Sequence, residues 1–265
     1  MSYPLPIFDH LTLNARDELG PCVAALESMG FLLTPPSYSN IGAVNQCVVL
    51  GDAYLEAIAI NPEAATPRRE LMLQPLGLNA LVFRTDDADA CYADLLARGL
   101  PALPVQPFSR MAKNSLGEDR EVSFRVVRFE PNWGAETFAF GRVYFCQHLN
   151  PEVVFDPGFA RHENGSQAFS GISVEVKEID QLSLTMKRLF GDAWEGDPSQ
   201  ARLRTQAFDI QFVRSTHDRI GTCAFKEIDS SSGRASAVGA VSQSKPMIES
   251  LKVIESRYGR FSFGV

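Results

Sequence analysis

A histidine stands in the middle of the first predicted strand, in the stretch FDHLTLN at residues 8–14. Strand alternation places two leucines on one face and the following side chains on the other: Phe8, His10, Thr12 and Asn14. The chain has only four histidines, and an imidazole on a strand can transfer protons or bind a transition metal. A hydrogen-bonded core position is the competing interpretation of His10 taken alone.

A glutamate interrupts a second strand face that is otherwise apolar or aromatic, in AYLEAIAI at residues 53–60. The side chains that share this face are Tyr54, Glu56, Ile58 and Ile60. A carboxylate on such a face is unfavourable unless it is paired, protonated or bound to a cation. An imidazole with a carboxylate is a donor set that suits Mn, Fe, Co, Ni or Zn. The prediction of a site therefore depends on how the two strands are placed.

The elements around these residues recur along the chain. A strand, a helix that stops at a glycine and two or three further strands are predicted from residue 8, again from residue 79 and more faintly from residue 171. The helices are predicted to stop at Gly30, Gly99 and Gly191. The strands after them are predicted at Asn45–Gly51, Ala53–Ile60, Glu121–Pro131, Gly141–Leu149, Ala207–Ser215 and Thr222–Asp229. Each unit is thus a βαβββ module.

Repeated βαβββ units that open with FDHLTLNARD and FRTDDADACYADLLARGL resemble the vicinal oxygen chelate superfamily, and within it the glyoxalase-like domain proteins (the glyoxalase, bleomycin resistance and extradiol dioxygenase fold). The resemblance implies an α+β fold in which paired modules at about 7–62 and 77–155, within residues 1–155, form a curled mixed sheet around a cup. A third, degenerate module is expected at 165–230. Residues 231–265 are expected to hold a Ser/Gly/Ala-rich linker and an amphipathic helix at Pro246–Arg257.

Members of that superfamily bind their metal through the first and last strands of each module. The resemblance therefore implies that His10 and Glu56 bind one divalent metal ion (Zn, Mn, Fe, Ni or Co), with Glu56 also serving as general base. The second module departs from this pattern, because Ala80 occupies its first-strand position and cannot bind a metal. A shift of one residue would offer only Asn79, a poor ligand.

The last strand of the second module offers two further donors. Counting from its glycine, as in the first module, places Cys146 at the position of Glu56 and His148 two residues beyond it. Either residue could complete a set with His10 and Glu56. A purely structural role is the alternative for each residue. Cys146 would then be a small buried hydrophobic residue, and His148 a strand-end residue before Asn150.

Four side chains are predicted to contact a small-molecule substrate: Arg84, Phe124, Arg128 and Cys146. Arg84 shares the cup-facing parity of Ala80, and a rim salt bridge is its alternative role. Phe124 and Arg128 lie on one strand face that mixes apolar and cationic character, as a site for an oxyanion would. His162 and His217 lie in polar, loop-like contexts and are predicted to be solvated.

Composition excludes several other functions. Among 265 residues, 32 acidic side chains outnumber 25 basic ones, giving a net charge of −7 with no basic block, which argues against nucleic acid or an anionic membrane as partner. No apolar run is long enough for a membrane span, and MSYPLPIFDH lacks the features of a signal peptide. The five cysteines are widely spaced, as free thiols would be in a reducing cytosol. A cytoplasmic location is expected.

Two functions from different classes follow. The first is a metal-dependent lyase, isomerase or dioxygenase that acts on a small molecule with vicinal oxygens. The alternative is a metal-free protein that binds a small molecule in the cup. The third module offers no ligand at its start or end, where Gly171, Ile172, Phe225 and Lys226 stand, and is expected to be structural or to form a homodimer surface.

Overall fold

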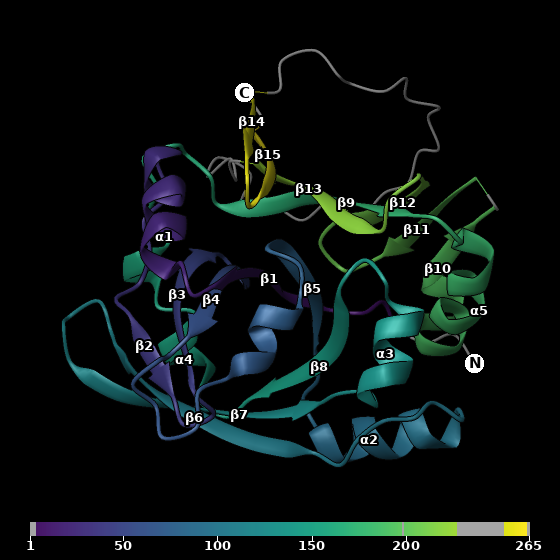
Figure 1. Cartoon of the computed structure of the whole chain (residues 1–265), viewed down its shortest axis with the longest axis horizontal. Coiled ribbons are helices and arrows are strands. Elements are labelled where there is room, and N and C mark those ends of the chain that lie inside the picture. Colours follow the sequence, from purple (N-terminus) through teal and green to yellow (C-terminus); the bar gives the residue numbers. More distant parts are fainter. Residues whose placement is uncertain (1–3, 198, 227–251, 264–265) are drawn as a thin grey trace, which may run out of the picture.

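The computed structural model describes residues 4–197, 199–226 and 252–263. Two β layers make up the fold: a closed barrel of eight strands and a seven-stranded sheet that lies across it (Figure 1). The layers contain both parallel and antiparallel strand pairs, and helices flank them. The predicted α+β class with a curled mixed sheet is confirmed, and the curling goes further than expected, to full closure.

The barrel consists of two modules in tandem. The first contains β1 (Phe8–Arg16), α1 (Leu19–Ser28), β2 (Ser37–Ser39), β3 (Ala43–Leu50) and β4 (Ala53–Ile60). The second contains β5 (Gly77–Arg84), α2 (Ala88–Ala97), β6 (Gln106–Lys113), β7 (Asp119–Val127), α3 (Pro131–Thr137) and β8 (Arg142–His148). The short helices η1 (Arg69–Leu73), α4 (Pro151–Val154) and η2 (Pro157–Phe159) lie between and after them. The Asp87 side chain caps α2 by accepting from the backbone N–H groups of Asp89 and Ala90.

Two seams join the modules and close the barrel. In each module the first strand runs parallel to the last, β1 beside β4 and β5 beside β8. Strands β1 and β5 then pair antiparallel at one seam, and the short β2 pairs with β6 at the other. Sequence patterns did not indicate β2 or β6, because three residues are too few for alternation and β6 is largely exposed.

The third module builds the second sheet. It contains β9 (Ala168–Val176), α5 (Ile179–Phe190), η3 (Gly191–Ala193), β10 (Trp194–Gly196), β11 (Gln200–Arg204), β12 (Asp209–Arg214) and β13 (Arg219–Lys226). Its inner face packs on the outer face of the barrel. Phe8 of β1 contacts Phe169 and Phe208 edge-on at centroid distances of 5.5 and 5.2 Å. The ring centroids of Phe83 in β5 and Phe190 in α5 lie 4.7 Å apart. The module therefore buries apolar side chains of β1 and β5.

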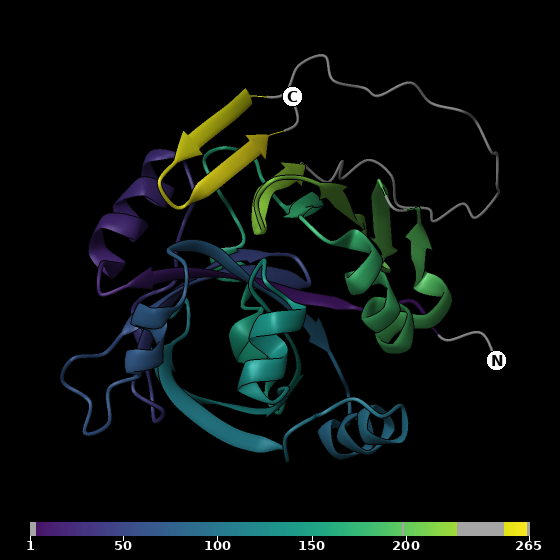
Figure 2. The ribbon, with the colours of Figure 1, turned by 45° about the vertical axis from the view of Figure 1, so that its right-hand side comes forward.

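The end of the chain differs from the prediction. Residues expected in the helix Pro246–Arg257 instead form strand β14 (Lys252–Ser256), paired with β15 (Gly259–Phe263) in the hairpin drawn in yellow in Figure 2. Strand β15 runs parallel to β13, whose open edge supplies backbone partners that a helical pattern cannot reveal. The two-residue loop before Gly259 fixes the hairpin. Residues 227–251, with the predicted linker and the first part of that helix, lie outside the described residues.

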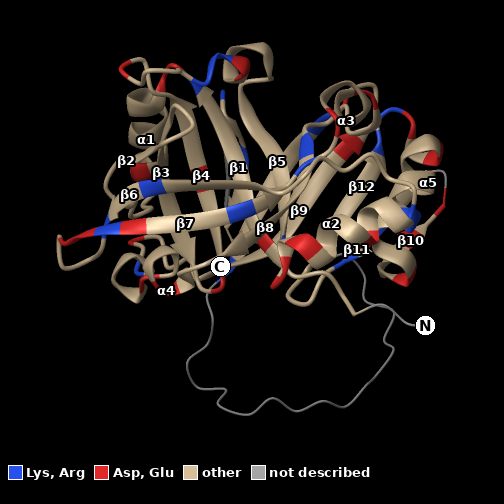
Figure 3. Ribbon diagram, turned by 90° about the horizontal axis from the view of Figure 1, so that it is seen from below, with Lys and Arg blue, Asp and Glu red and all other residues tan. Residues whose placement is uncertain are grey.

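Basic and acidic residues are interspersed over the ribbon seen from below (Figure 3). Within the described part of the chain, no helix is both long and apolar enough to cross a membrane.

The five cysteines are all free. Burial raises the pKa of Cys22 and Cys47 to about 12 and that of the half-buried Cys91 to about 11. Burial also raises the pKa of Cys146 and Cys223. At pH 8 the folded protein should therefore react slowly with a thiol reagent, first at Cys91, because the thiolate is the reactive form.

After denaturation without reductant, all five thiols should react. In the folded protein, the Cys91→Ser variant should lack the thiol that reacts first. Recovery of three or fewer thiols from fresh protein would contradict the free-thiol prediction.

Candidate functional site

An irregularity in β1 shapes the site. Phe8 pairs with Phe83 of β5, yet His10 pairs with the adjacent Val82, so Asp9 is an extra residue between them. Such a bulge reverses the alternation of side chains. Phe8 therefore lies in the outer core, and the prediction that it shares the face of His10 is wrong. The Asp9 side chain lies with His10 inside the barrel.

The Asp9 carboxylate is fully buried and accepts hydrogen bonds from three side chains. His10 Nδ1 lies 2.7 Å away, His148 Nε2 lies 2.9 Å from both carboxylate oxygens, and Arg84 Nε lies 2.9 Å from Oδ1. Burial alone would raise the pKa of Asp9, but the hydrogen bonds from His10 and His148 outweigh it and hold the pKa well below its ordinary value. Asp9 is therefore an anion that orients both rings.

His10 presents its second nitrogen to the interior of the barrel. Because the Asp9 carboxylate needs a donor at Nδ1, the proton is assigned to that atom, which leaves a lone pair on Nε2. This Nε2 lies 3.2 Å from the Tyr144 hydroxyl and 3.8 Å from Glu56 Oε2. The imidazole also stacks on Tyr54 at a centroid distance of 4.4 Å. The ring is thus fixed on one side and open to Glu56 on the other.

Glu56 of β4 is held at one oxygen and free at the other. Asn45 Nδ2 donates to Oε1 at 2.5 Å, and Asn45 Oδ1 accepts from Arg110 Nη1 at 3.2 Å. Oε2 faces His10. The structure therefore brings the predicted pair His10 and Glu56 together over one face of the barrel.

Register between the strands corrects the count made on β8. In the first module Tyr54 pairs with His10 and Glu56 with Thr12; in the second, Arg142 pairs with Ala80 and Tyr144 with Val82. Tyr144, and not Cys146, thus corresponds to Glu56. Counting from the glycine failed because pairing begins with Arg142 directly after Gly141, whereas in the first module it begins three residues after Gly51.

His148 and Cys146 lie beside Asp9. His148 directs Nε2 at that carboxylate rather than at Glu56, and its ring is surrounded by Phe124 and Phe155 at centroid distances of 5.2 Å. Donor atoms of Asp9, Cys146 and His148 lie within 4.8 Å of one another. Burial raises the pKa of Cys146, which keeps its thiol protonated. These three donors form a second group beside the pair His10 and Glu56, and Asp9 within it already accepts hydrogen bonds from His10, His148 and Arg84.

The residues predicted to contact substrate occupy different places. Arg84 donates to Asp9 and to the Asp52 carbonyl and thus matches its alternative role as a salt-bridge residue. Phe124 stacks on Phe108 at 4.8 Å inside the barrel. Arg128, just after β7, lines two adjacent cavities.

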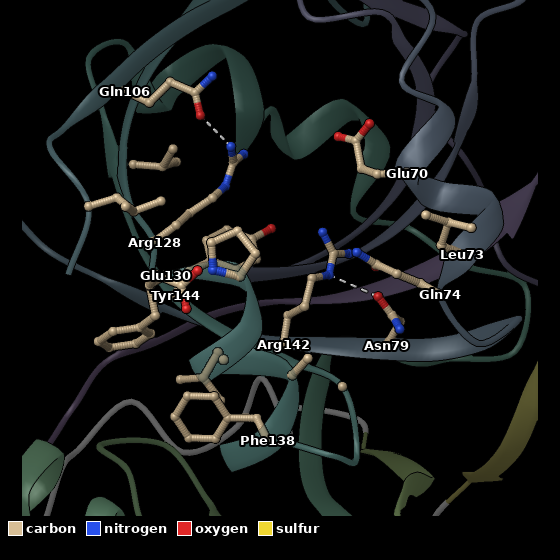
Figure 4. A pocket seen from close by; sticks show the side chains of 18 of the residues that line it. Glu70, Leu73, Gln74, Asn79, Gln106, Arg128, Glu130, Phe138, Arg142 and Tyr144 are labelled. Carbon is tan, nitrogen blue, oxygen red and sulfur yellow. Dashed lines mark hydrogen bonds between the residues drawn. The ribbon is translucent and has the colours of Figure 1, made fainter. Parts of the chain in front are cut away.

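These two cavities share four lining residues, which are Arg68, Val126, Arg128 and Tyr144. The inner one, of about 30 Å³, is lined by His10, Glu56 and Tyr144 among others. The outer one, of about 730 Å³, lies between η1, α3 and the start of β8 (Figure 4). An outer cavity of this size fits a small organic molecule, whereas the inner one has room for only a few atoms.

Three polar residues of the site were not anticipated. Strict alternation from His10 would turn Asp9 to the other face, Tyr144 lay outside the counted position, and Arg142 lies in a cavity formed partly by α3. The only signal for Asp9 was its position beside His10, and no sequence pattern indicated the other two.

The donors at the inner cavity fit a metal ion as a partial set. The Asp9–His10 hydrogen bond is the outer support that metal-binding histidines usually have. Nε2 of His10, Oε2 of Glu56 and the Tyr144 hydroxyl converge, with Nε2 lying 3.2–3.8 Å from the two oxygens. Donors of one ion bound at about 2.0–2.2 Å lie roughly that far apart. Ala80 leaves the fourth superfamily position without a donor.

A closed barrel of two βαβββ modules around this polar cup defines a protein of the vicinal oxygen chelate superfamily. A model of the glyoxalase-like domain matches residues 8–190, more than half of the chain. The chain therefore belongs to the glyoxalase-like domain family. A search of curated proteins found no match.

The solved structures that are similar to this chain have low sequence identity to it. A hypothetical protein from Staphylococcus aureus has a TM-score of 0.71 and 12% identity, over 98% of this chain and 99% of its own. A xylose isomerase-like TIM barrel/4-hydroxyphenylpyruvate dioxygenase fusion protein has a TM-score of 0.51 and 15% identity, over 87% of this chain and 38% of its own. A mutant of 4-hydroxymandelate synthase from Streptomyces coelicolor has a TM-score of 0.47 and 13% identity, over 86% and 72%.

The role of Asp9 can be tested with an Asp9→Asn variant. The substitution removes the charge that His10, His148 and Arg84 share, so the free energy of unfolding should fall by about 3–5 kcal/mol in urea denaturation. Because the folded-state pKa is lowered, the stabilisation is present above about pH 4 and is lost as the pH falls further. The acid-induced loss of stability should therefore be shallower in the variant.

Asp89→Asn is the matched control, because Asp89 also pairs with an arginine, Arg125, but on the surface. Its urea midpoint should stay near that of the wild type. Equal effects of the two substitutions would show that Asp9 has no special role.

Proposed function

We propose that this protein is a metal-dependent enzyme of the glyoxalase-like fold that acts on a small molecule with vicinal oxygens. The observation that supports this most is the geometry of His10: Asp9 fixes one nitrogen, and the other faces the free oxygen of Glu56. His10 and Glu56 would hold one divalent ion, with the Tyr144 hydroxyl beside them. A bound ion of this kind supplies Lewis-acid polarisation of two adjacent substrate oxygens.

The side chains around this pair have defined tasks in the proposal. Glu56 would also serve as general base through Oε2 when this oxygen is released from the ion, because Asn45 engages only the other oxygen. The Tyr144 hydroxyl donates a hydrogen bond to His10 Nε2 in the free enzyme. In the proposal it donates this hydrogen bond to a substrate oxygen instead when substrate is bound. The inner cavity holds little water, so a charge that develops on substrate is stabilised by these fixed groups rather than by solvent.

The proposed reaction is of the lyase, isomerase or dioxygenase type. Membership of the glyoxalase-like domain family supports the fold on which such reactions occur, and one structural relative is named as a dioxygenase fusion protein. A metal-free binding protein is the second candidate. It is favoured by Ala80 and Tyr144, which replace both ligand positions of the second module.

Metal analysis of protein purified without an affinity tag separates the two candidates. The wild type should contain about one divalent ion per chain. His10→Ala and Glu56→Gln should each lower the metal content strongly while leaving the far-ultraviolet circular dichroism unchanged. His148→Ala should weaken metal affinity about 10–100-fold, because His148 supports Asp9 and thereby His10.

His217→Ala is the control for histidine loss as such, because His217 is exposed on the third module. It should bind metal like the wild type. If the wild type binds no metal, or if all four variants bind it equally well, the metal-dependent proposal is wrong and the metal-free candidate replaces it.

A further inference from the structure

The outer cavity contains two arginines that are not neutralised by a carboxylate. Arg142 Nε donates to the Asn79 side chain at 2.9 Å, and Arg128 Nη1 donates to Gln106. The Nη2 atom of Arg142 and the Nε atom of Arg128 are shielded from solvent and have no hydrogen-bond partner among the described residues. Figure 4 shows both guanidinium groups projecting into the cavity, each linked to one amide side chain.

Such an arrangement is unfavourable for the empty protein. Arg128 and Arg142 are partly buried, and a partly buried cation without a counter-ion loses hydration that neutral amides replace only in part. Burial lowers the pKa of Arg142 to about 10, and burial with repulsion from Arg68 lowers that of Arg128. Both groups stay protonated near neutral pH, so the cavity retains its positive charge.

The local backbone holds Arg142 in this place. Gly141 has φ +155°, and a Cβ atom there would lie 2.2 Å from the Asn79 carbonyl oxygen. This close approach sets the start of β8 directly beside Asn79, whose side chain then receives Arg142 Nε. Tyr144 follows on the same strand face, and the guanidinium carbons of Arg128 and Arg142 lie 5.7 and 5.9 Å from its ring centroid.

The charge balance of the cavity indicates the kind of anion. Its charged lining residues are Arg68, Glu70, Arg128, Glu130 and Arg142. Arg68 and Glu70 form a salt bridge at 2.8 Å, and the Glu130 side chain accepts from the backbone of Trp133. One net positive charge is left, which a monoanion neutralises. Much of the remaining wall is apolar, with Leu73, Phe129, Phe138 and Val143 among its members.

We infer that the outer cavity binds the carboxylate of an organic acid between Arg128 and Arg142, with the apolar part of the acid against the aromatic and aliphatic wall. That this acid is the substrate rests on the proposed function. The carboxylate would then be bound next to Tyr144, whose hydroxyl reaches His10 Nε2. The guanidinium groups would select and position the molecule at the entrance to the inner cavity.

Binding of simple acids and their neutral amides tests this inference. Isothermal titration calorimetry would compare 3-phenylpropionate with 3-phenylpropanamide, and hexanoate with hexanamide. At least one acid should bind about 10–100-fold more tightly than its amide, as charge-assisted hydrogen bonds allow. Arg128→Met and Arg142→Met should each remove most of this preference.

Arg125→Met is the matched control. Arg125 lies in β7, just before Arg128, but pairs with Asp89 on the surface. It should keep the preference for the acid. Replacing Arg142 also leaves the Asn79 side-chain oxygen without its donor. If Arg142→Met unfolds, Arg128→Met is decisive, because within the described residues the Arg128 guanidinium donates a hydrogen bond to Gln106 alone. Thermal denaturation of each variant identifies such unfolding.

Several results would overturn the inference: no acid preferred over its amide, a preference that survives both arginine substitutions, or tighter binding of phenyl phosphate than of either acid. His10→Ala separates this test from that of the proposed function. It should keep the preference for the acid, so a protein that selects acids but contains no metal would retain this inference and lose the enzyme proposal.

Discussion

The site depends on the burial of one carboxylate inside a β-barrel. Asp9 is stable there as an anion only because two imidazoles and a guanidinium donate to it at once. Each donor comes from a different strand end: His10 from β1, Arg84 from β5 and His148 from β8. The same contacts therefore join the two modules at their seam and fix the orientation of His10. Stability and the geometry of the site have a common origin in this network.

The two modules have the same fold but different side chains at matching positions. The first module presents His10 and Glu56, and the second presents Ala80 and Tyr144. Two residues before Tyr144 the second module has Arg142 where the first has Tyr54, and Arg128 follows β7 nearby. Duplication thus supplies two related walls, of which one is suited to metal or proton chemistry and the other to an anion. The two sides of the cup therefore differ in chemistry, although the two modules have the same strand pairing.

Much of this arrangement could be predicted from sequence, and the exceptions have specific physical causes. Alternation and the superfamily resemblance together placed His10 and Glu56 on the inner faces of two strands, which are the neighbours β1 and β4. The same rule failed at Asp9, where a bulge adds one residue, and at Tyr144, where strand pairing begins closer to the preceding glycine than in the first module. Arg142 escaped notice because its cavity is formed by elements distant in sequence. The C-terminal hairpin depends on the edge of another sheet.

The shared wall between the two cavities has a kinetic consequence. The inner cavity, of about 30 Å³, is too small for any ligand larger than a few atoms unless its walls move. Arg68, Val126, Arg128 and Tyr144 belong to both linings, so a molecule in the outer cavity contacts side chains that also close the inner one. Passage from the outer cavity to His10 therefore requires side chains of this shared wall to move, which makes the rate of entry depend on their motion.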